Sequence, residues 1–283
     1  MISFTTTANV LRALHHAHRI EMCAYVLRSK EVLDALEFAA QHQAHVSVRL
    51  EAHPYADPDG KLAKLNRDVV EKLQTAGVHA SLADVANRRA NHMKAAIVDG
   101  VAFLDDRNWP LDRRNVVVKD DAPRDVRTIH NALHGKPIST TALAVTKGSA
   151  LAQEVAMLHG RATHSAVSIE TESFTAGSAP YGAIKALARA GVDVRLLLCK
   201  EDAKPAMLSA ARALARDGVT VRFTQAAEKF AVARDRGWIG SANATFGRAG
   251  QIDWGLRLSN PALCKTLQKR FDRTWRCAKP LDA

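Results

Sequence analysis

The most constraining feature of this 283-residue sequence is that its pattern of helices and strands is repeated. Apolar residues at helical spacing alternate with short β-branched runs, which is typical of an α/β fold. In the first half the pattern predicts helices over 8–18, 30–41, 62–75 and 123–133 and strands over 20–27, 46–50, 78–82, 95–98, 101–104 and 115–119. In the second half it predicts helices over 150–158, 181–189, 204–216 and 262–275 and strands over 166–171, 192–199, 230–232, 237–239 and 255–258. A repeat of this size predicts two pseudosymmetric α/β/α halves, each with a mixed central sheet.

Matched helix ends support the duplication. One predicted helix is followed by Gly77 and the corresponding helix by Gly218, an offset of 141 (218 − 77). Glycine in this place is typical of a left-handed helix cap. The segment 135–148 between the two copies contains Gly, Pro, Ser and Thr, which is typical of a linker. We therefore expect one half over residues 1–135 and the other over 136–283.

The composition is that of a globular, basic protein. Hydrophobic residues make up 47% of the chain, charged residues 24%, and the formal net charge is +11. This charge favours nucleic acid, an anionic membrane surface or an acidic small substrate as a partner, although a solvated basic surface has the same composition. The sequence has no run of about 18 apolar residues and no signal-peptide pattern. We expect a cytoplasmic protein without a transmembrane segment.

The first half contains a group of residues suited to phosphate chemistry. His92 and Lys94 precede two apolar runs that are joined by Asp99-Gly100, a pair that favours a tight hairpin turn. Residues i and i+2 of a strand share a face, so His92 and Lys94 point the same way. A nucleophile or proton carrier beside a fixed cation suits a phosphate. Asn108 follows the hairpin.

The second half contains a degenerate counterpart. Lys229 matches Lys94 at an offset of 135 (229 − 94), and a Gly-Ser-x-Asn sequence brings Ser241 and Asn243 after a second predicted hairpin. Ala227 stands where the first copy has its histidine, and Arg234 where it has its aspartate.

The pattern His-x-Lys-x4-Asp followed by Gly-Ser-x-Asn resembles the phospholipase D superfamily, also called the HKD family. The resemblance covers nearly the whole chain, including the closing Asp253-Trp-Gly-Leu segment and a final helix with Phe271 and Trp275. It implies an internally duplicated phospholipase D-like α/β fold. The first copy departs from the family pattern at Asp105-Asp106, where Gly-Ser is usual, and the second copy lacks the histidine.

The resemblance also implies a mechanism. One histidine attacks phosphorus to form a phosphohistidine, and a second histidine protonates the leaving oxygen. In this sequence His92 takes the nucleophile role with Lys94 beside it, and Asp99 orients a histidine. The phosphate-binding residues would be Asn108, Lys229, Ser241 and Asn243. The resemblance requires neither a metal nor an organic cofactor, and the four cysteines show no C-x-x-C spacing of a zinc site.

The missing second histidine leaves three alternatives open. Another acid can replace it, and the candidates are Glu228, His53, His130, His159 and His164. A good leaving group can depart without an acid, or the protein can have become a binding relative. We therefore expect a metal-independent phosphodiesterase acting on a nucleic acid or a phospholipid headgroup. The alternative is a catalytically impaired protein that binds phosphate or nucleic acid. We expect a monomer, because the duplication supplies an internal partner. The sequence does not separate hydrolysis from transfer to an alcohol.

Overall fold

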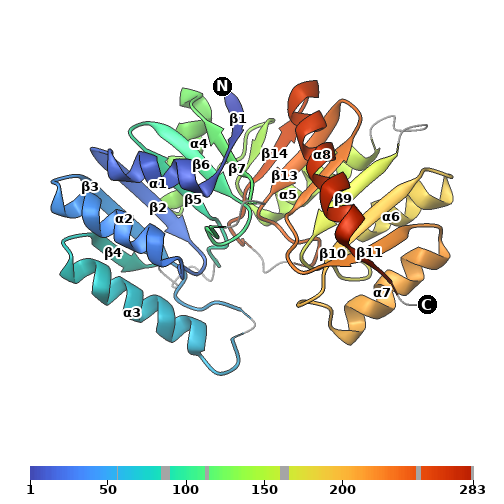
Figure 1. Cartoon of the computed structure of the whole chain (residues 1–283), viewed down its shortest axis with the longest axis horizontal. Helices are drawn as coiled ribbons and strands as arrows, with labels where there is room; N and C mark the ends of the chain where they lie inside the picture. The colour runs from blue at the N-terminus through green and yellow to red at the C-terminus, as the bar shows by residue number, and fades with distance from the viewer. Residues whose placement is uncertain (56, 84–89, 112–114, 160–165, 247–249, 282–283) are drawn as a thin grey trace. The chain divides into compact units, whose positions relative to one another are not determined.

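The computed structural model describes residues 1–55, 57–83, 90–111, 115–159, 166–246 and 250–281. The chain divides into two compact units (Figure 1). The first unit comprises Met1–Lys147 and Arg248–Trp254, and the second comprises Gly148–Gly247 and Gly255–Ala283. The first unit therefore extends beyond the half expected at 1–135, and it also takes a short segment from late in the sequence. That late segment matters because it carries Asp253.

The first unit is built on a seven-stranded mixed sheet with the strand order β1-β7-β6-β5-β2-β3-β4. The strands β2, β3 and β4 are parallel, and the remaining neighbours pair antiparallel. The strands are β1 (Ile2–Thr5), β2 (Arg19–Ala24), β3 (His45–Leu50), β4 (His79–Leu82), β5 (Ala95–Val98), β6 (Val101–Asp105) and β7 (Val117–Asp120). The helices are α1 (Thr7–His15), α2 (Lys30–Gln41), α3 (Lys61–Thr75) and α4 (Pro123–Leu133).

Helices cover both faces of this sheet. The core between the sheet and α1, α2 and α3 contains Ile20, Met22 and Ala24, alternate residues of β2. Side chains at odd positions of β2 must therefore point to the opposite face, and α4 packs there against β2, β5 and β6. Because both faces are covered, β5 is buried along its whole length, which explains its unbroken apolar sequence.

The second unit repeats this plan. Its strands run in the order β15-β11-β10-β9-β12-β13-β14, and β9, β10 and β11 are parallel. The strands are β9 (Val167–Thr171), β10 (Val194–Cys199), β11 (Thr220–Thr224), β12 (Phe230–Ala233), β13 (Arg236–Gly240), β14 (Gly255–Leu258) and β15 (Lys279–Pro280). The helices are α5 (Lys147–His159), α6 (Ala179–Arg189), α7 (Pro205–Arg216) and α8 (Pro261–Cys277), and the short strand β8 (Leu143–Ala144) precedes α5.

The two units share one strand order. The series β7-β6-β5-β2-β3-β4 in the first unit corresponds strand for strand to β14-β13-β12-β9-β10-β11 in the second. The predicted duplicated α/β fold with mixed sheets is therefore confirmed. The strands β1, β8, β11 and β15 were not predicted. In the part of the chain that the structure describes, no helix is long and apolar enough to cross a membrane.

Local sequence signals explain the turns that frame the motif. Asp99 and Gly100 both adopt left-handed backbone angles, with φ of 46° and 81°, as a two-residue hairpin turn requires. The hairpin of β5 and β6 is therefore confirmed. Gly77 and Gly218 also have positive φ, 85° and 101°, which confirms the left-handed caps after α3 and α7.

Candidate active site

His92 lies in the short segment before β5 and is held there by backbone hydrogen bonds. Its amide donates to the carbonyl oxygen of Ile252 at 2.9 Å, and the amide of Ile252 donates to Ala90 at 2.9 Å. This pairing brings the segment 250–254 alongside the motif of the first unit. The His92 side chain is buried.

The carboxylate of Asp253 holds the His92 ring. Oδ1 of Asp253 lies 2.7 Å from Nδ1 of His92, and Gln251 donates to Oδ2 at 2.6 Å. Burial raises the pKa of Asp253, but His92 and, to a smaller extent, Lys94 and Lys147 outweigh it and lower that pKa to about 2. A carboxylate ionised at neutral pH only accepts hydrogen bonds, so Nδ1 of His92 carries the proton. In a neutral imidazole, Nε2 then holds the lone pair.

Lys94 places a cation beside that lone pair. Its Nζ lies 3.0 Å from Nε2 of His92 and donates to the carbonyl oxygen of His92 at 2.9 Å. The side chain is 1% exposed, and Nζ lies 5.4 Å from the centroid of the Tyr25 ring. The predicted proximity of His92 and Lys94 therefore exists in the structure. An oxyanion close to Nε2 would meet the lysine charge at short range.

Two tyrosines complete the surroundings of His92. The ring centroids of Tyr25 and Tyr55 lie 4.7 Å and 5.4 Å from that of His92, and the Tyr25 hydroxyl donates to the carbonyl oxygen of Tyr55 at 2.9 Å. These rings restrict the rotation of the imidazole. Neither tyrosine was predicted, because both precede the motif by tens of residues and belong to no recognisable spacing.

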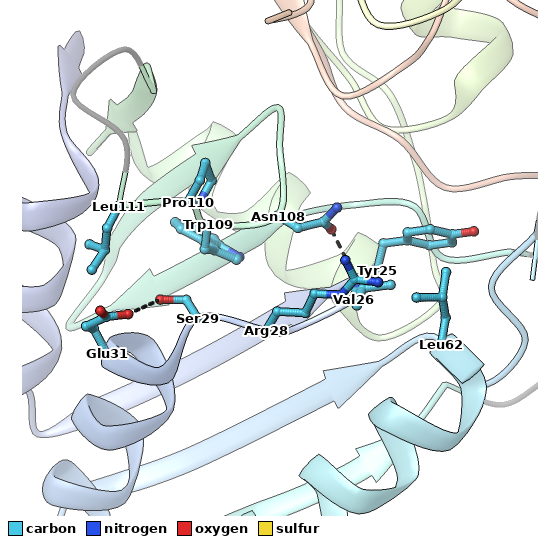
Figure 2. Close-up of a pocket in the computed structure, with 10 residues that line it drawn as sticks. All are labelled: Tyr25, Val26, Arg28, Ser29, Glu31, Leu62, Asn108, Trp109, Pro110 and Leu111. Atoms are coloured by element: carbon cyan, nitrogen blue, oxygen red, sulfur yellow. Dashed lines mark hydrogen bonds between the residues drawn. The ribbon is translucent and has the colours of Figure 1, made fainter. Parts of the chain in front are cut away.

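Asn108 borders a pocket of about 490 Å³ (Figure 2). Its Oδ1 accepts from the amide of Val26 at 3.3 Å, which fixes the side chain at the carboxyl end of β2. Figure 2 shows Asn108, Trp109 and Pro110 along one side of the pocket and Arg28 along the other. Tyr25 also lines the pocket. The pocket therefore shares Tyr25 with the surroundings of His92 and adds a cation, Arg28.

Asp99 does not orient His92. Its carboxylate sits at the hairpin turn and accepts from the backbone amides of His18 and Arg19 at 2.8–3.1 Å. The prediction that Asp99 orients a histidine therefore does not hold for His92, since Asp253 occupies its Nδ1. The physical reason is the turn itself: Asp99 lies at the far end of β5 from His92, and it fastens the hairpin to the start of β2.

Asp105 and Asp106 are both fully buried. The carboxylate of Asp105 accepts from the Trp109 amide at 2.6 Å and from the Asn115 side chain at 2.8 Å. Burial and the neighbouring charge of Asp106 raise the pKa of Asp105 to about 7. Asp105 thus stabilises the turn that carries Asn108.

In the second unit the carboxylate of Glu172 lies beside two of the predicted phosphate-binding residues, Lys229 and Asn243. Oε2 of Glu172 lies 2.9 Å from Nζ of Lys229 and 3.4 Å from Nδ2 of Asn243. Lys229 is 1% exposed and Ser241 is fully buried, while the Glu172 side chain is 29% exposed. The two residues Lys229 and Asn243 do come together, as predicted, but around Glu172. An anionic ligand would have to compete with this carboxylate.

Strand registers show how the two units differ at matched positions. Ala95 and Phe230 are matched, because each follows the lysine of its motif. Their strand partners are Cys23 and Glu170, and the residues two positions later, Tyr25 and Glu172, therefore correspond to each other. The matched asparagines confirm this register, because Asn108 accepts from Val26 as Asn243 accepts from Ser173.

The same comparison identifies the residue of the first copy that matches Asp253. Asp105 pairs with Val117 in the first unit, and Gly240 pairs with Gly255 in the second. Two residues before each of these partners stand Asn115 and Asp253. The first unit therefore has an amide at the position that matches the histidine-binding aspartate.

Of the other acids considered from sequence, Glu228 and His130 have side-chain partners of their own. Glu228 is buried and accepts from Arg270 at 3.0 Å. His130 lies 2.7 Å from Glu21. The backbone amide of His53 donates to Glu51, His159 ends α5, and His164 lies outside the described residues.

Comparison with known proteins agrees with the fold. Residues 160–275 match the family described as "Cardiolipin synthase, PLD-like domain". The structure resembles phosphatidylserine synthase from Haemophilus influenzae Rd KW20 with a TM-score of 0.73 and 12% identity, over 99% of this chain and 87% of that one. It resembles polyphosphate kinase from Porphyromonas gingivalis with a TM-score of 0.68 and 15% identity, over 98% of this chain. The chain spans 47% of that kinase. A search of the curated proteins found no match.

The match over residues 160–275 and the fold confirm the resemblance to the phospholipase D superfamily that the motifs predicted. The matched segment covers most of the second unit. The match falls on the half with the degenerate motif, and the half with the intact His-x-Lys-x4-Asp sequence lies outside it.

Proposed function

We propose that the protein is a metal-independent phosphodiesterase in which Nε2 of His92 attacks the phosphorus atom of a phosphodiester. The observation that carries this proposal is the hydrogen bond of 2.7 Å between Asp253 and Nδ1 of His92, with Nζ of Lys94 3.0 Å from Nε2. This arrangement leaves the lone pair on the nitrogen beside the cation. Asp253 would stabilise the positive imidazole ring that forms when Nε2 bonds to phosphorus.

The proposed reaction proceeds in two steps, and neither step requires a metal ion. Nε2 forms a bond to phosphorus, the ester oxygen leaves with its electron pair, and water later displaces His92 to release the phosphate monoester. Lys94 and Asn108 are proposed to bind the non-bridging oxygens in the first unit. Lys229, Ser241 and Asn243 are proposed as phosphate-binding groups of the second unit, in competition with Glu172.

The pocket beside Asn108 is proposed to bind the part of the substrate that flanks the phosphodiester. Its volume of about 490 Å³ accommodates a group as large as a nucleoside or a lipid headgroup. Arg28 would attract an additional negative charge on that group. Together with the net charge of +11, this favours a polyanionic substrate such as nucleic acid over a zwitterionic headgroup.

The proposal is tested with the wild-type protein and the variants His92→Ala and His92→Asn in EDTA. Bis(p-nitrophenyl) phosphate has a leaving group that needs no acid, whereas short DNA has an alkoxide leaving group. We expect wild-type protein to cleave the aryl ester and both variants to fall to background. A radiolabelled substrate should leave an acid-labile label on the wild-type chain only. Equal rates for wild type and both variants would disprove nucleophilic catalysis by His92.

A binding function is the second candidate, and Ala227 at the position of the second histidine favours it. Loss of a positioned proton donor costs on the order of 10²–10⁴-fold in rate. This candidate predicts DNA or phosphate binding that weakens steeply with salt, without turnover of either substrate. Cleavage of the aryl ester and not of DNA would instead indicate a catalyst that lacks its acid.

A further inference from the structure

Three side chains with metal-binding atoms meet on the face of the first sheet that α4 covers. Glu21 lies on β2 between Ile20 and Met22, which point into the opposite core, so Glu21 points toward α4. His130 lies on α4, and His134 follows at its C-terminal cap. Residues four apart share one face of a helix, and both imidazoles therefore lie over the same carboxylate.

The distances are close to those of a metal site. Oε2 of Glu21 lies 2.7 Å from Nδ1 of His130 and 3.5 Å from Nε2 of His134, and the ligand atoms all lie within 4.8 Å of one another. In a tetrahedral zinc site with bonds of 2.0–2.1 Å, ligand atoms are roughly 3.3 Å apart. Small side-chain rotations would bring the three ligand atoms within bonding distance of one ion. The two histidine side chains have room to rotate, because they are 43% and 48% exposed.

Arg19 prepares the carboxylate for this role. Its guanidinium donates to Oε1 of Glu21 at 2.6 Å and 3.0 Å, which leaves Oε2 facing the two imidazoles. Burial raises the pKa of Glu21, but hydrogen bonds from Arg19 and His130 outweigh it, so that the pKa lies below its usual value. Charged groups that orient a ligand in this way are a regular part of metal sites.

Room for a fourth ligand lies next to the group. A pocket of about 400 Å³ is lined by Glu21 and His134 and also by His45 and His79. A water molecule or one of these imidazoles could complete the coordination of a divalent ion.

The second unit shows that the fold does not demand these residues. Pro261 begins α8 as Pro123 begins α4, and both helices follow matched strands, so Gln268 and Asp272 correspond to His130 and His134. Ser168 of β9 corresponds to Glu21, and Gln268 donates to Ser168 at 3.1 Å and to Asp272 at 2.9 Å. Ordinary hydrogen bonds therefore suffice to join the helix to the sheet at this place.

We propose that Glu21, His130 and His134 bind a divalent transition-metal ion, with Zn²⁺ as the best fit to one carboxylate and two imidazoles. Glu21 lies on β2, and Tyr25 follows the end of this strand four residues later, roughly 13 Å away. The site is thus separate from His92, and the bound ion would fasten α4 to β2 as a structural element. The inference does not depend on the proposed hydrolytic function.

The experiment uses full-length protein with its purification tag removed, stripped of metal, and titrated calorimetrically with ZnCl₂ at pH 7.5. The variant Cys277→Ser serves as background, because Cys277 is an exposed thiol and thiolates are zinc ligands. We expect one Zn²⁺ per chain and a higher melting temperature with Zn²⁺. Glu21→Gln and His134→Ala should each weaken binding at least ~10-fold.

His16→Ala is the matched control, since His16 is an exposed histidine after α1, and it should bind Zn²⁺ like the background protein. His92→Ala should retain full affinity. Absence of stoichiometric binding by the full chain would overturn the proposal, as would unchanged affinity in Glu21→Gln and His134→Ala when circular dichroism shows both variants to be folded.

Discussion

Asp253→Asn is the sharpest test of the candidate active site. The substitution keeps the size of the side chain and removes the charge that faces Nδ1 of His92 at 2.7 Å. Asparagine can also present its amide N–H to Nδ1, which would favour the tautomer with the proton on Nε2. The nucleophilic lone pair would then point at residue 253 and away from Lys94.

The structure limits the size of the effect. Burial raises the pKa of Asp253, yet His92 and the two lysines bring it from 3.8 down to about 2. This net lowering corresponds to roughly 2.5 kcal/mol of favourable interaction that survives the cost of burial. Two unit charges 2.7 Å apart interact by about 6 kcal/mol at an effective dielectric constant of 20. We therefore expect kcat to fall by roughly 10²- to 10⁴-fold, with KM changed little because Asp253 lies behind the imidazole.

The assay is hydrolysis of bis(p-nitrophenyl) phosphate in EDTA, and Asp99→Asn is the control. Asp99 belongs to the sequence motif, but its carboxylate binds the backbone of His18 and Arg19. Its loss should lower the melting temperature and leave kcat within about two-fold. The assignment fails if Asp99→Asn and Asp253→Asn, both folded, lose the same fraction of kcat.

Three further predictions concern other buried or paired carboxylates. Glu172→Gln should free Lys229 and tighten the binding of inorganic phosphate about five-fold, the equivalent of ~1 kcal/mol; Glu201→Gln, on an exposed turn, should not, and equal effects would reduce the result to net charge. Burial raises the pKa of Glu154 to about 8, so the folded state keeps a proton that the unfolded state loses above pH ~4.3, and stability should fall as pH rises from about 4.5 to 8. Glu154→Gln should abolish that fall, and a melting temperature with the same pH dependence as wild type would contradict the burial of this group. Asn115→Asp would place a second carboxylate 2.8 Å from Asp105, so its melting temperature should drop more at pH 8 than at pH 5. Asn115→Ala removes the hydrogen bond to Asp105 without adding a charge, so its loss at pH 8 should be smaller than that of Asn115→Asp.

The structural features that were predicted correctly from the sequence are those that depend on neighbouring residues. The Asp99-Gly100 turn and the glycine caps at Gly77 and Gly218 each depend on two or three neighbouring residues, and all three are found. The strand β1 was missed because its alternating sequence, Ile-Ser-Phe-Thr, is only four residues long, and the strand is defined by its pairing with β7, which begins with Ile2 opposite Asp120. Such an edge strand depends on a partner that is distant in the sequence.

The charged partners of His92 and Lys229 could not be predicted from the spacing of residues in the sequence. His92 and Asp253 lie 161 positions apart and meet only because the segment around Ile252 pairs with the segment around Asn91. Glu172 reaches Lys229 in the same way, from the end of a neighbouring strand. The motif correctly predicted that His92 and Lys94 are neighbours, but the family aspartate drew attention to Asp99, whose carboxylate binds the backbone of His18 and Arg19.

The unusual Asp105-Asp106 sequence becomes intelligible once the two units are compared position by position. Where the second copy in the sequence has Gly240 and Asp253, the first copy has Asp105 and Asn115. Asn115 donates to Asp105 at 2.8 Å, and an aspartate at 115 could not donate when ionised, because two buried carboxylates would then repel each other. The aspartate at 105 and the amide at 115 are therefore compatible only as a pair. Position 115 of the first copy and position 253 of the second therefore differ in charge, and the carboxylate at 253 is the one that binds His92. The aspartate at 105 and the amide at 115 thus form one consistent difference between the two copies.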